Sequence, residues 1–351
     1  MADKFNKSKL LAEIKDLKLR LGSNKKLIID GASAKVREGE ILGIIGESGS
    51  GKTVLTSTLT GLNIDIQIIE NGEIFIQNID VTNFDFDSWA KSGLRGKKVS
   101  TVFQNPLSSI NPYRKIGSQI IESILTNTDE DISYDEAYNI SVELLEKVKI
   151  HNAEEVMRMY PHQMSGGMNQ RIVIVIILAA QPDLIIFDEP TTALDPLAQA
   201  QIIEIIREIR DETNIGIIFI SHDIALISSI ADTIAIMYAG RVIEQGTAEE
   251  IIKDPKHPYT WGLLMSMPDY MDGSEDELYS IRGIVPTNIE EVEGDSFAPR
   301  NDYALEIDFL EKPPRFNITD THFVYSWLYH KNAPKFDLPK AIKKAKNNHG
   351  Q

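Results

Sequence analysis

The sequence of 351 residues contains no cysteine. This absence excludes disulfide bonds, thiolate metal sites, cysteine nucleophiles and cysteine-bound iron–sulfur clusters. Basic residues are also few, since 36 lysines and arginines stand against 52 aspartates and glutamates, for a formal net charge of −16. A chain this acidic is poorly suited to bind a nucleic-acid backbone over a broad surface. We therefore expect no nucleic-acid partner.

Long hydrophobic runs are missing as well. The longest, at residues 172–180, is much shorter than the roughly 20 apolar residues that span a bilayer. Residues 1–21 carry lysines between the apolar residues and lack the continuous apolar segment of an export signal. We therefore expect a cytoplasmic protein that reaches a membrane only through a partner or a surface contact.

The clearest motif is the stretch Gly-Glu-Ser-Gly-Ser-Gly-Lys-Thr at residues 46–53. It follows an apolar run at residues 40–45 that is short enough for a buried strand, and a helix is predicted to begin at about Lys52. Glycines allow the backbone to curl until its N–H groups face a polyphosphate. Lys52 can then contact the β and γ phosphates, and the Thr53 hydroxyl can bind Mg²⁺. The candidate nucleotide-binding residues here are Gly46, Ser48, Gly49, Ser50, Gly51, Lys52 and Thr53.

Strand and helix patterns alternate along the rest of the chain. Residues 10–40 predict antiparallel strands, and helical spacing between residues 111 and 160 predicts a helical insert. Apolar runs at residues 182–189 and 215–220, with a helix between them, are typical of a largely parallel sheet. From residue 268 onward, acidic and proline-containing stretches predict a separate, irregular C-terminal region.

Polar side chains stand at the ends of several predicted strands. Asp188 and Glu189 end one apolar run, where one carboxylate can hold Mg²⁺ and the other can orient or deprotonate a water that attacks the γ phosphate. Gln104 and His222 follow two further strands. Because parallel strands end at one edge of the sheet, we expect all four near residues 46–53, where Gln104 and His222 can sense the γ phosphate or position the water.

A second candidate anion site lies at residues 164–168, which read Met-Ser-Gly-Gly-Met. Ser165 is a good helix N-cap, and Gly166 and Gly167 leave backbone N–H groups open at the helix start. One chain has no evident use for two such sites around a single γ phosphate. Two chains that face each other would use both sites, if each chain closes the nucleotide site of the other.

These motifs together resemble the ATP-binding subunits of ABC transporters, from about residue 10 to about residue 265. In the order of that family they correspond to Walker A at 46–53, the Q-loop at Gln104, the signature at 165–168, Walker B at 184–189, the D-loop ending at Asp195 and the switch histidine His222. The signature with methionines at both ends, His-Pro-Tyr-Thr at 257–260 and Phe-Ala-Pro-Arg at 297–300 are similar to the oligopeptide/dipeptide/nickel importer branch.

The resemblance implies an α/β P-loop NTPase of ABC type, with a mostly parallel sheet core, an antiparallel β subdomain and a helical insert. It implies a nucleotide-binding domain at residues 1–267, with a helical subdomain at about 105–164. A C-terminal extension of the importer type would follow at residues 268–351.

It also implies ATP and Mg²⁺ as cofactors and an ATPase that powers import of oligopeptides or related small solutes. Glu189, His222 and Gln104 would be catalytic, and Thr53, Gln104 and Asp188 would hold the metal. The residues implied to contact ATP across a subunit interface are Ser165, Gly166, Gly167 and Asp195.

The implied partners are a second, related but non-identical ATPase subunit, two transmembrane permeases and, indirectly, an external peptide-binding protein. The chain would then lie at the cytoplasmic face of the membrane as a peripheral subunit. The transported substrate is not encoded here, because specificity in such importers lies with the permeases and the binding protein.

The sequence departs from the family pattern in three respects. Related C-terminal regions often hold an iron–sulfur cluster on four cysteines, and the matching positions here are Asp295, Asn301, Asp308 and Ser326. Without that metal we expect the region to rest on packing alone. The early strand pair, residues 19–29, also lacks the aromatic residue on which the family usually stacks adenine, so weaker base selectivity is expected. Asn169 replaces a more usual arginine, with little expected effect.

Two alternatives remain at this point. A soluble ABC protein acting on DNA or ribosomes usually carries two ATPase units or a long coiled-coil insertion, and neither is visible in this sequence. A regulatory subunit that binds ATP without hydrolysing it is expected to have lost one of Lys52, Asp188, Glu189 and His222, and all four are present.

Overall fold

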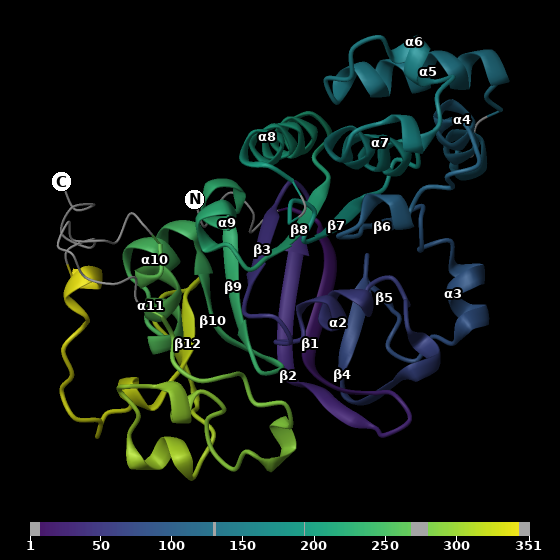
Figure 1. Ribbon diagram of the computed structural model, residues 1–351. Helices are drawn as coiled ribbons and strands as arrows, with labels where there is room; N and C mark the ends of the chain where they lie inside the picture. Colours follow the sequence, from purple (N-terminus) through teal and green to yellow (C-terminus); the bar gives the residue numbers. More distant parts are fainter. Residues whose placement is uncertain (1–7, 129–130, 193, 268–279, 344–351) are drawn as a thin grey trace.

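The computed structural model describes residues 8–128, 131–192, 194–267 and 280–343, and these form two β-sheets (Figure 1). The larger sheet has eight strands in the order β11-β12-β10-β9-β3-β8-β7-β6, and the smaller has four in the order β2-β1-β4-β5. No helix within these ranges is both long enough and apolar enough to cross a bilayer. The prediction of an α/β fold with an antiparallel sheet beside the core is confirmed.

Five neighbouring strands of the larger sheet run parallel and form its core. They are β3 (Ile41–Ile45), β6 (Val99–Val102), β7 (Leu184–Asp188), β8 (Gly216–Ser221) and β9 (Thr233–Tyr238). Every residue of β3, β7 and β8 is buried, as expected for parallel strands that are covered on both faces. The loops that follow these strands therefore meet at one edge of the sheet.

The smaller sheet is antiparallel and packs beside the core through β2 and β10. Its strands are β1 (Leu10–Leu21), β2 (Lys26–Arg37), β4 (Gln67–Ile76) and β5 (Ile79–Asp80). Leu17, Leu19 and Ile29 are fully buried, and together with Leu42 and Ile44 of β3 they belong to one hydrophobic cluster. This shared core holds the antiparallel sheet against the strand that leads into residues 46–53.

Helices flank the core strands and connect them. Apart from the helices between residues 116 and 178, which are described below, the α-helices are α2 (Lys52–Ser57), α3 (Phe86–Ser92), α8 (Pro196–Thr213), α9 (Ile224–Ile230), α10 (Ala248–Lys253) and α11 (Pro258–Met265). Short 3₁₀ turns lie at η1 (Ile64–Ile66), η2 (Pro106–Ser108), η3 (Pro161–Gln163), η5 (Ile289–Glu291), η6 (Ala298–Arg300), η7 (Glu306–Phe309) and η8 (Trp327–Tyr329).

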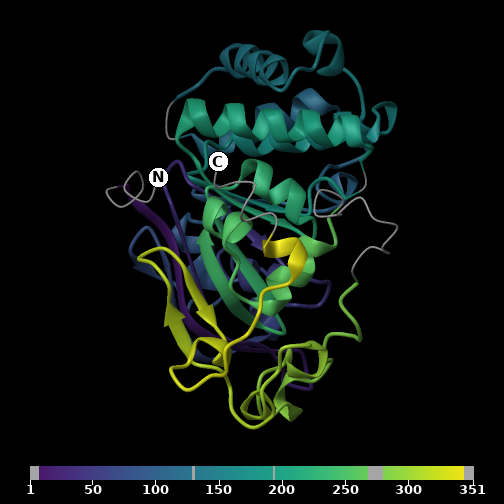
Figure 2. The same cartoon turned by 90° about the vertical axis from the view of Figure 1, so that its left-hand side faces the viewer.

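A layer of helices lies above the sheet in Figure 1 and, after a quarter turn, in Figure 2. It consists of α4 (Ile116–Asn127), α5 (Tyr134–Lys147), α6 (Ala153–Val156) and α7 (Gly166–Leu178). The buried face of α4 is made of isoleucines 116, 120, 121 and 124, which recur at helical spacing as predicted. Ser133 begins α5 with a reciprocal capping box to Glu136. The subdomain bounds of about 105–164 stay a prediction.

The C-terminal region contributes two strands to the core sheet, so it is less separate than the sequence indicated. In this region β12 (Phe323–Tyr325) pairs with β10 (Arg241–Thr247), and β11 (Arg315–Asn317) pairs with β12. The added strands satisfy backbone groups on the outer edge of β10 that would otherwise be left unpaired. The domain division at residue 268 stays a prediction.

The expectation that this region rests on packing alone is wrong, because hydrogen bonds also hold it. Glu244 of β10 is fully buried, and its carboxylate accepts from Thr260 Oγ1 at 2.5 Å and pairs with His322 Nε2 at 2.7 Å. At each of the four cysteine-matching positions, the side chain accepts a backbone N–H from two or three residues away, at 2.7 to 3.3 Å. The four residues are Asp295, Asn301, Asp308 and Ser326. Local turns therefore order these positions without a metal.

Candidate functional site

The loop at residues 46–51 connects β3 to α2, and α2 begins at Lys52 as predicted. Its glycines are required by space and by backbone conformation. A Cβ on Gly46 would lie 2.2 Å from the Met237 carbonyl oxygen, and Gly51 has a φ of +100°. The loop is therefore a tight backbone ring whose shape depends on glycine, as a phosphate cradle needs.

Lys52 lies across this ring. Its Nζ donates to the carbonyl oxygens of Gly46 at 2.8 Å and Glu47 at 3.0 Å. The side chain is buried, and burial lowers its pKa, while the carboxylates of Glu189 and Asp188 act in the opposite direction. The cation is thus held at the place where a polyphosphate would approach the loop.

Thr53 and Asp188 are brought together from distant parts of the sequence. Thr53 Oγ1 donates to Asp188 Oδ1 at 3.0 Å, although 135 residues separate them in the chain. Burial raises the pKa of the Asp188 carboxyl, and the Thr53 hydrogen bond lowers it. A hydroxyl beside one carboxylate suits Mg²⁺, which keeps several waters and takes few protein ligands besides phosphate oxygens. No group of three or more His, Cys, Asp or Glu in the described ranges forms a separate metal site.

Glu189 and His222 form a second close pair. His222 Nδ1 lies 3.5 Å from Glu189 Oε2, and Thr192 Oγ1 donates to the same carboxylate oxygen at 3.0 Å. The backbone of Glu189 is left-handed, with a φ of 49°, and its N–H donates to the Ile220 carbonyl. Such strained positions cluster at functional sites, where they aim a side chain. The pair therefore lies at the carboxyl end of β7 and β8, beside Asp188.

Gln104 lies two residues beyond the end of β6, the neighbour of β7. Its side chain is exposed, and within the described ranges it makes no hydrogen bond to Thr53 or Asp188. The strand order places it at the expected edge of the sheet. Among the described residues, no hydrogen bond joins its side chain to the other predicted site residues.

The signature residues lie in the upper helical layer, away from α2 (Figure 1). Ser165 caps α7 as predicted, with its Oγ accepting from the Met168 N–H at 3.3 Å. A Cβ on Gly166 would meet open space. Asn169 is buried and donates to the carbonyls of Pro161 and Met164, so it holds the turn before the signature.

Asp195 is close to the signature in the fold. It caps α8, with Oδ1 accepting from the Ala198 N–H at 2.9 Å. A Cβ on Gly167 would lie 3.5 Å from Ala198 Cβ, so the start of α7 and the start of α8 are neighbours. The capping role of Asp195 is a structural function that the sequence analysis missed. Ala193, the first residue of the predicted D-loop that ends at Asp195, lies outside the described residues.

The sequence analysis also missed a set of contacts between the C-terminal half of the chain and the loop at residues 46–51, which we call the phosphate loop. The Glu47 N–H donates to Tyr259 Oη at 3.0 Å, and Arg300 Nη1 donates to both carboxylate oxygens of Glu47, at 3.0 and 3.1 Å. These partners are 212 and 253 residues away along the chain. Tyr259 and Arg300 belong to the tetrapeptides at 257–260 and 297–300, which the sequence marked only as family features.

An apolar surface lies next to Gln104. Phe103, Leu107 and Tyr113 are exposed, and Tyr113 is 90% exposed. Beside them is a groove of about 520 Å³, lined by Thr101, Phe103, Ser108, Ser109, Val173, Ile176 and Ile177. Exposed apolar side chains beside a groove with an apolar lining are typical of a site for another macromolecule.

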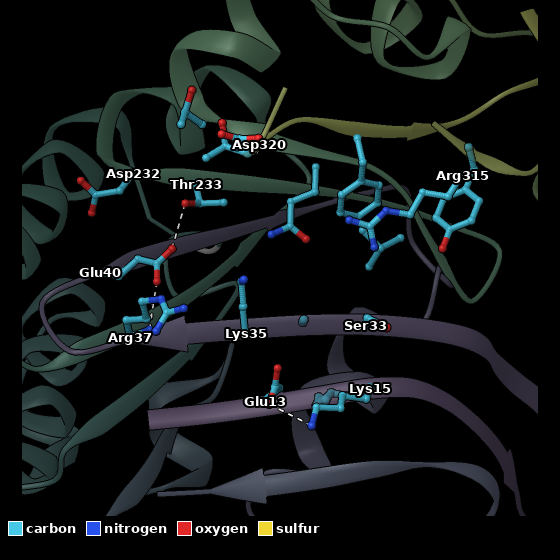
Figure 3. Close-up of a pocket in the computed structure, with 18 of the residues that line it drawn as sticks. Glu13, Lys15, Ser33, Lys35, Arg37, Glu40, Asp232, Thr233, Arg315 and Asp320 are labelled. Atoms are coloured by element: carbon cyan, nitrogen blue, oxygen red, sulfur yellow. Dashed lines mark hydrogen bonds and ion pairs between the residues drawn. The ribbon is translucent and has the colours of Figure 1, made fainter. Parts of the chain in front are cut away.

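A cleft of about 780 Å³ lies elsewhere, between the two sheets (Figure 3). It opens at the starts of β3 and β9, opposite the edge that carries residues 46–53. Its buried carboxylate, Glu40, accepts from Thr233 Oγ1 at 2.8 Å and from the Arg37 N–H at 2.9 Å. Asp232 accepts from the Ile41 N–H and from Arg210. These acids hold the strand starts, and the cleft lies at the opposite end of the sheet from residues 46–53.

Comparison with known families gives two matches. Residues 29–192 match the family model described as ABC transporter, and residues 243–307 match the model described as oligopeptide/dipeptide transporter, C-terminal region. The second match spans both the Tyr259 and the Arg300 segments. It therefore covers the contacts that reach the phosphate loop from behind.

Several curated relatives are similar over most of their length. The chain is 45% identical over 318 residues to the oligopeptide transport ATP-binding protein AmiE of Streptococcus pneumoniae, covering 90% of this chain and 87% of that one. It is 43% identical over 336 residues to the oligopeptide transport ATP-binding protein OppD of Bacillus subtilis, covering 95% and 93%.

Solved structures show the same fold. The chain matches cbiO1 from Clostridium perfringens with a TM-score of 0.61 and 24% identity, covering 70% of this chain and 92% of that one. It matches the ATP-binding cassette MJ0796, a dimeric structure bound to ADP and Pi, with a TM-score of 0.59 and 23% identity, covering 68% and 99%. Together with the relatives above, these matches confirm the predicted resemblance and fold: the chain belongs to the ABC transporter family of ATPases, in its oligopeptide/dipeptide branch.

Proposed function

We propose that this chain hydrolyses ATP to power the import of oligopeptides, or of related small solutes, through a membrane ABC transporter. One observation carries the proposal. Lys52, Thr53, Asp188, Glu189 and His222 lie at one edge of the sheet, in a chain whose relatives are named as oligopeptide transport subunits. The C-terminal family match supports the same branch.

Residues 46–53 hold the phosphates of ATP in this proposal, and Lys52 is the cation that contacts the β and γ phosphates. Thr53 and Asp188 hold Mg²⁺, with Gln104 joining them at the neighbouring strand end. Bound Mg²⁺ neutralises developing negative charge on the phosphate oxygens. The close Thr53–Asp188 pair supports this assignment.

Glu189 orients the attacking water and accepts its proton. The water oxygen bonds to the γ phosphorus, the bond between that phosphorus and the β–γ bridging oxygen breaks, and ADP leaves with the bonding electrons. His222, 3.5 Å from the Glu189 carboxylate, holds that carboxylate in place and contacts the γ phosphate. The strained backbone of Glu189 supports a role in aiming the side chain.

A second ATPase subunit completes the site. Ser165, Gly166, Gly167 and Asp195 contact the ATP that is bound to the opposite chain, and that chain is a related, non-identical subunit. The open space at Gly166 and the position of α7 in the upper layer support a surface that faces outward to a partner.

Two transmembrane permeases contact the exposed apolar side chains at Phe103, Leu107 and Tyr113. The groove of about 520 Å³ beside them is suited to receive a short helix from each permease. The chain is then a peripheral subunit at the cytoplasmic face of the membrane, and an external peptide-binding protein acts on it only through the permeases.

Co-expression with the permeases tests this function. We expect the chain to co-purify with them from membranes and peptide to stimulate ATP hydrolysis in reconstituted vesicles. Leu107→Asp should reduce co-purification at least about tenfold and leave ATP binding intact, because a carboxylate cannot enter an apolar interface without a partner. Leu310→Asp is the matched control, since Leu310 is exposed in the C-terminal region. A chain that never associates with permeases would contradict the proposal.

A further inference from the structure

Glu47 is the one residue of the phosphate loop whose main chain and side chain are both held by the C-terminal half of the protein. Its N–H donates to Tyr259 Oη at 3.0 Å, and its carboxylate accepts from Arg300 at 3.0 and 3.1 Å. Its carbonyl accepts from Lys52 at 3.0 Å. Three residues therefore hold the loop at Glu47, which lies between the candidate phosphate-binding positions Gly46 and Ser48.

Arg300 is built to reach this carboxylate. Only 5% of its side chain is exposed, and its Nε and Nη2 donate to the carbonyls of Arg282 and Gly283 at 2.8 and 3.3 Å. Nη1 also donates to Tyr238 Oη at 3.2 Å. These bonds orient the guanidinium, which is always charged in proteins, so that one edge faces Glu47.

The segment that carries Arg300 is fixed by aromatic packing. Phe297 contacts Tyr238 and Tyr259 edge to face, with ring centroids 5.2 and 5.3 Å apart. Tyr259 is the same residue that accepts the Glu47 N–H. Phe297 therefore links the segment that carries Arg300 to Tyr259, so both contacts with Glu47 come from one packed cluster.

The charge of Glu47 makes Arg300 important when a polyphosphate binds. Lys52 Nζ donates to the Gly46 and Glu47 carbonyls, so the cation that contacts the phosphates in the proposed function also holds the loop. The Glu47 carboxylate is near enough to Lys52 to act on the pKa of its amine in the raising direction, so its negative charge would also repel a polyphosphate bound at Lys52. Arg300 is the cation in direct contact with that carboxylate, so it offsets the repulsion and keeps the loop in shape.

We propose that Arg300 is a positioning residue for ATP binding, which acts by neutralising Glu47 and holding the phosphate loop to the C-terminal region. The proposal rests on the proposed role of residues 46–53 as the nucleotide site. It makes the C-terminal region a contributor to ATP affinity. If Arg300 had a purely structural role, it would stabilise the fold of its own segment, and its effect would not depend on the charge of Glu47.

The test measures equilibrium binding of the non-hydrolysable β,γ-imido analogue of ATP, with Mg²⁺, to the full chain. Arg300→Gln should weaken binding about tenfold, the order expected when one unit charge near the phosphates loses its partner. Glu47→Gln, measured in the same assay, is the reference for the double variant, because it removes the charge that Arg300 neutralises. The double variant Arg300→Gln/Glu47→Gln should match Glu47→Gln, because no charge is left to neutralise.

Arg282→Gln is the matched control, because it removes one positive charge from an exposed residue whose backbone carbonyl accepts from Arg300 Nε. Thermal unfolding of each variant reports on the fold. In the reconstituted complex, Arg300→Gln should raise KM for ATP about tenfold and leave kcat at saturating ATP close to that of the unmodified chain.

Two results would overturn the proposal. One is an Arg300→Gln chain that binds the analogue like the unmodified chain. The other is a double variant that binds as weakly as Arg300→Gln alone, because Arg300 would then act through the fold and not through charge. Lys52→Ala separates this failure from failure of the site itself: if Lys52→Ala keeps full affinity, residues 46–53 are not the nucleotide site and both proposals fall.

Discussion

The hydroxyl of Thr53 donates a hydrogen bond to the carboxylate of Asp188 at 3.0 Å, joining the start of α2 to the end of β7. Asp188 is 9% exposed, so its charge has little access to water. Lys52 offsets part of that charge, and a second cation would stabilise the ionised carboxylate further. In the proposed function that cation is the Mg²⁺ of Mg–ATP.

From this pair we predict that Asp188→Asn removes the effect of Mg²⁺ on nucleotide affinity. Asparagine keeps the size of the side chain and can still accept the Thr53 hydrogen bond, but it lacks the charge that attracts the metal. Titration of the ATP analogue with and without Mg²⁺ measures the effect. Thr53→Ser, which keeps the hydroxyl, should retain the Mg²⁺ effect. An Asp188→Asn chain with undiminished Mg²⁺ dependence would exclude Asp188 as a ligand.

Glu189→Gln should abolish nearly all hydrolysis while ATP binding is retained. Glutamine is similar in size but cannot accept the proton of the attacking water, and general bases of this kind contribute about 10²–10⁴-fold. Steady-state hydrolysis and analogue binding, measured on the same preparation, separate the two effects. His222→Ala should reduce hydrolysis less than Glu189→Gln does, because His222 holds the carboxylate 3.5 Å away. Unchanged turnover in Glu189→Gln would remove Glu189 from the catalytic assignment.

Ser165→Arg should leave analogue binding by the isolated chain unchanged and lower hydrolysis in the assembled complex at least about tenfold. Ser165 caps α7 in the upper layer. An arginine at this position would therefore obstruct the ATP bound to the partner subunit and not the ATP bound to its own chain. Ser133→Arg is a matched control, because it removes the N-cap of α5, at a cost of about 1 kcal/mol. If Ser165→Arg weakened binding by the isolated chain, the assignment to the opposite subunit would be wrong.

Asp295→Asn should stabilise the fold above pH 6. Burial raises the pKa of Asp295 from 3.8 to about 6, so between about pH 4 and 6 the folded chain binds more protons than the unfolded chain does. Stability from this group is therefore lost as pH rises through that window. Asparagine stays neutral and can still accept the Phe297 N–H, so the gain at pH 7 should be roughly 1–3 kcal/mol.

Chemical denaturation of both proteins between pH 4 and 8 measures this effect as a difference curve. The two proteins should be equally stable near pH 4, and the difference should grow up to about pH 6 and then stay constant. A difference that does not change with pH would show that Asp295 is ionised throughout that range in the fold.

Much of the candidate site was predictable because its parts are short and local. The spacing of residues 46–53 requires a glycine loop before a helix, and α2 begins at Lys52 as expected. Placing Asp188, Glu189 and His222 at strand ends was enough to bring them to one edge, because parallel strands end together. Gln104 followed the same rule, but its side chain is exposed and makes no hydrogen bond to these residues in the described part of the chain.

The C-terminal region was the part least predictable from sequence. Its strands are three residues long, which is too short for periodicity to reveal, and β12 exists by pairing with β10. The four polar residues at cysteine-matching positions suggested only the loss of a metal. In the fold they accept backbone N–H groups and order the turns themselves.

The sequence by itself determined the α/β fold class, the ABC family, and the placement of the candidate site residues at the ends of β3 and β7, because each depends on residues close together in the chain. Only the tertiary structure decided what lies behind the phosphate loop. Arg300 and Tyr259 reach Glu47 across 253 and 212 residues, and no local pattern connects side chains so far apart. Such contacts arise when the sheet brings the C-terminal region against the loop, so the folded chain alone reveals them.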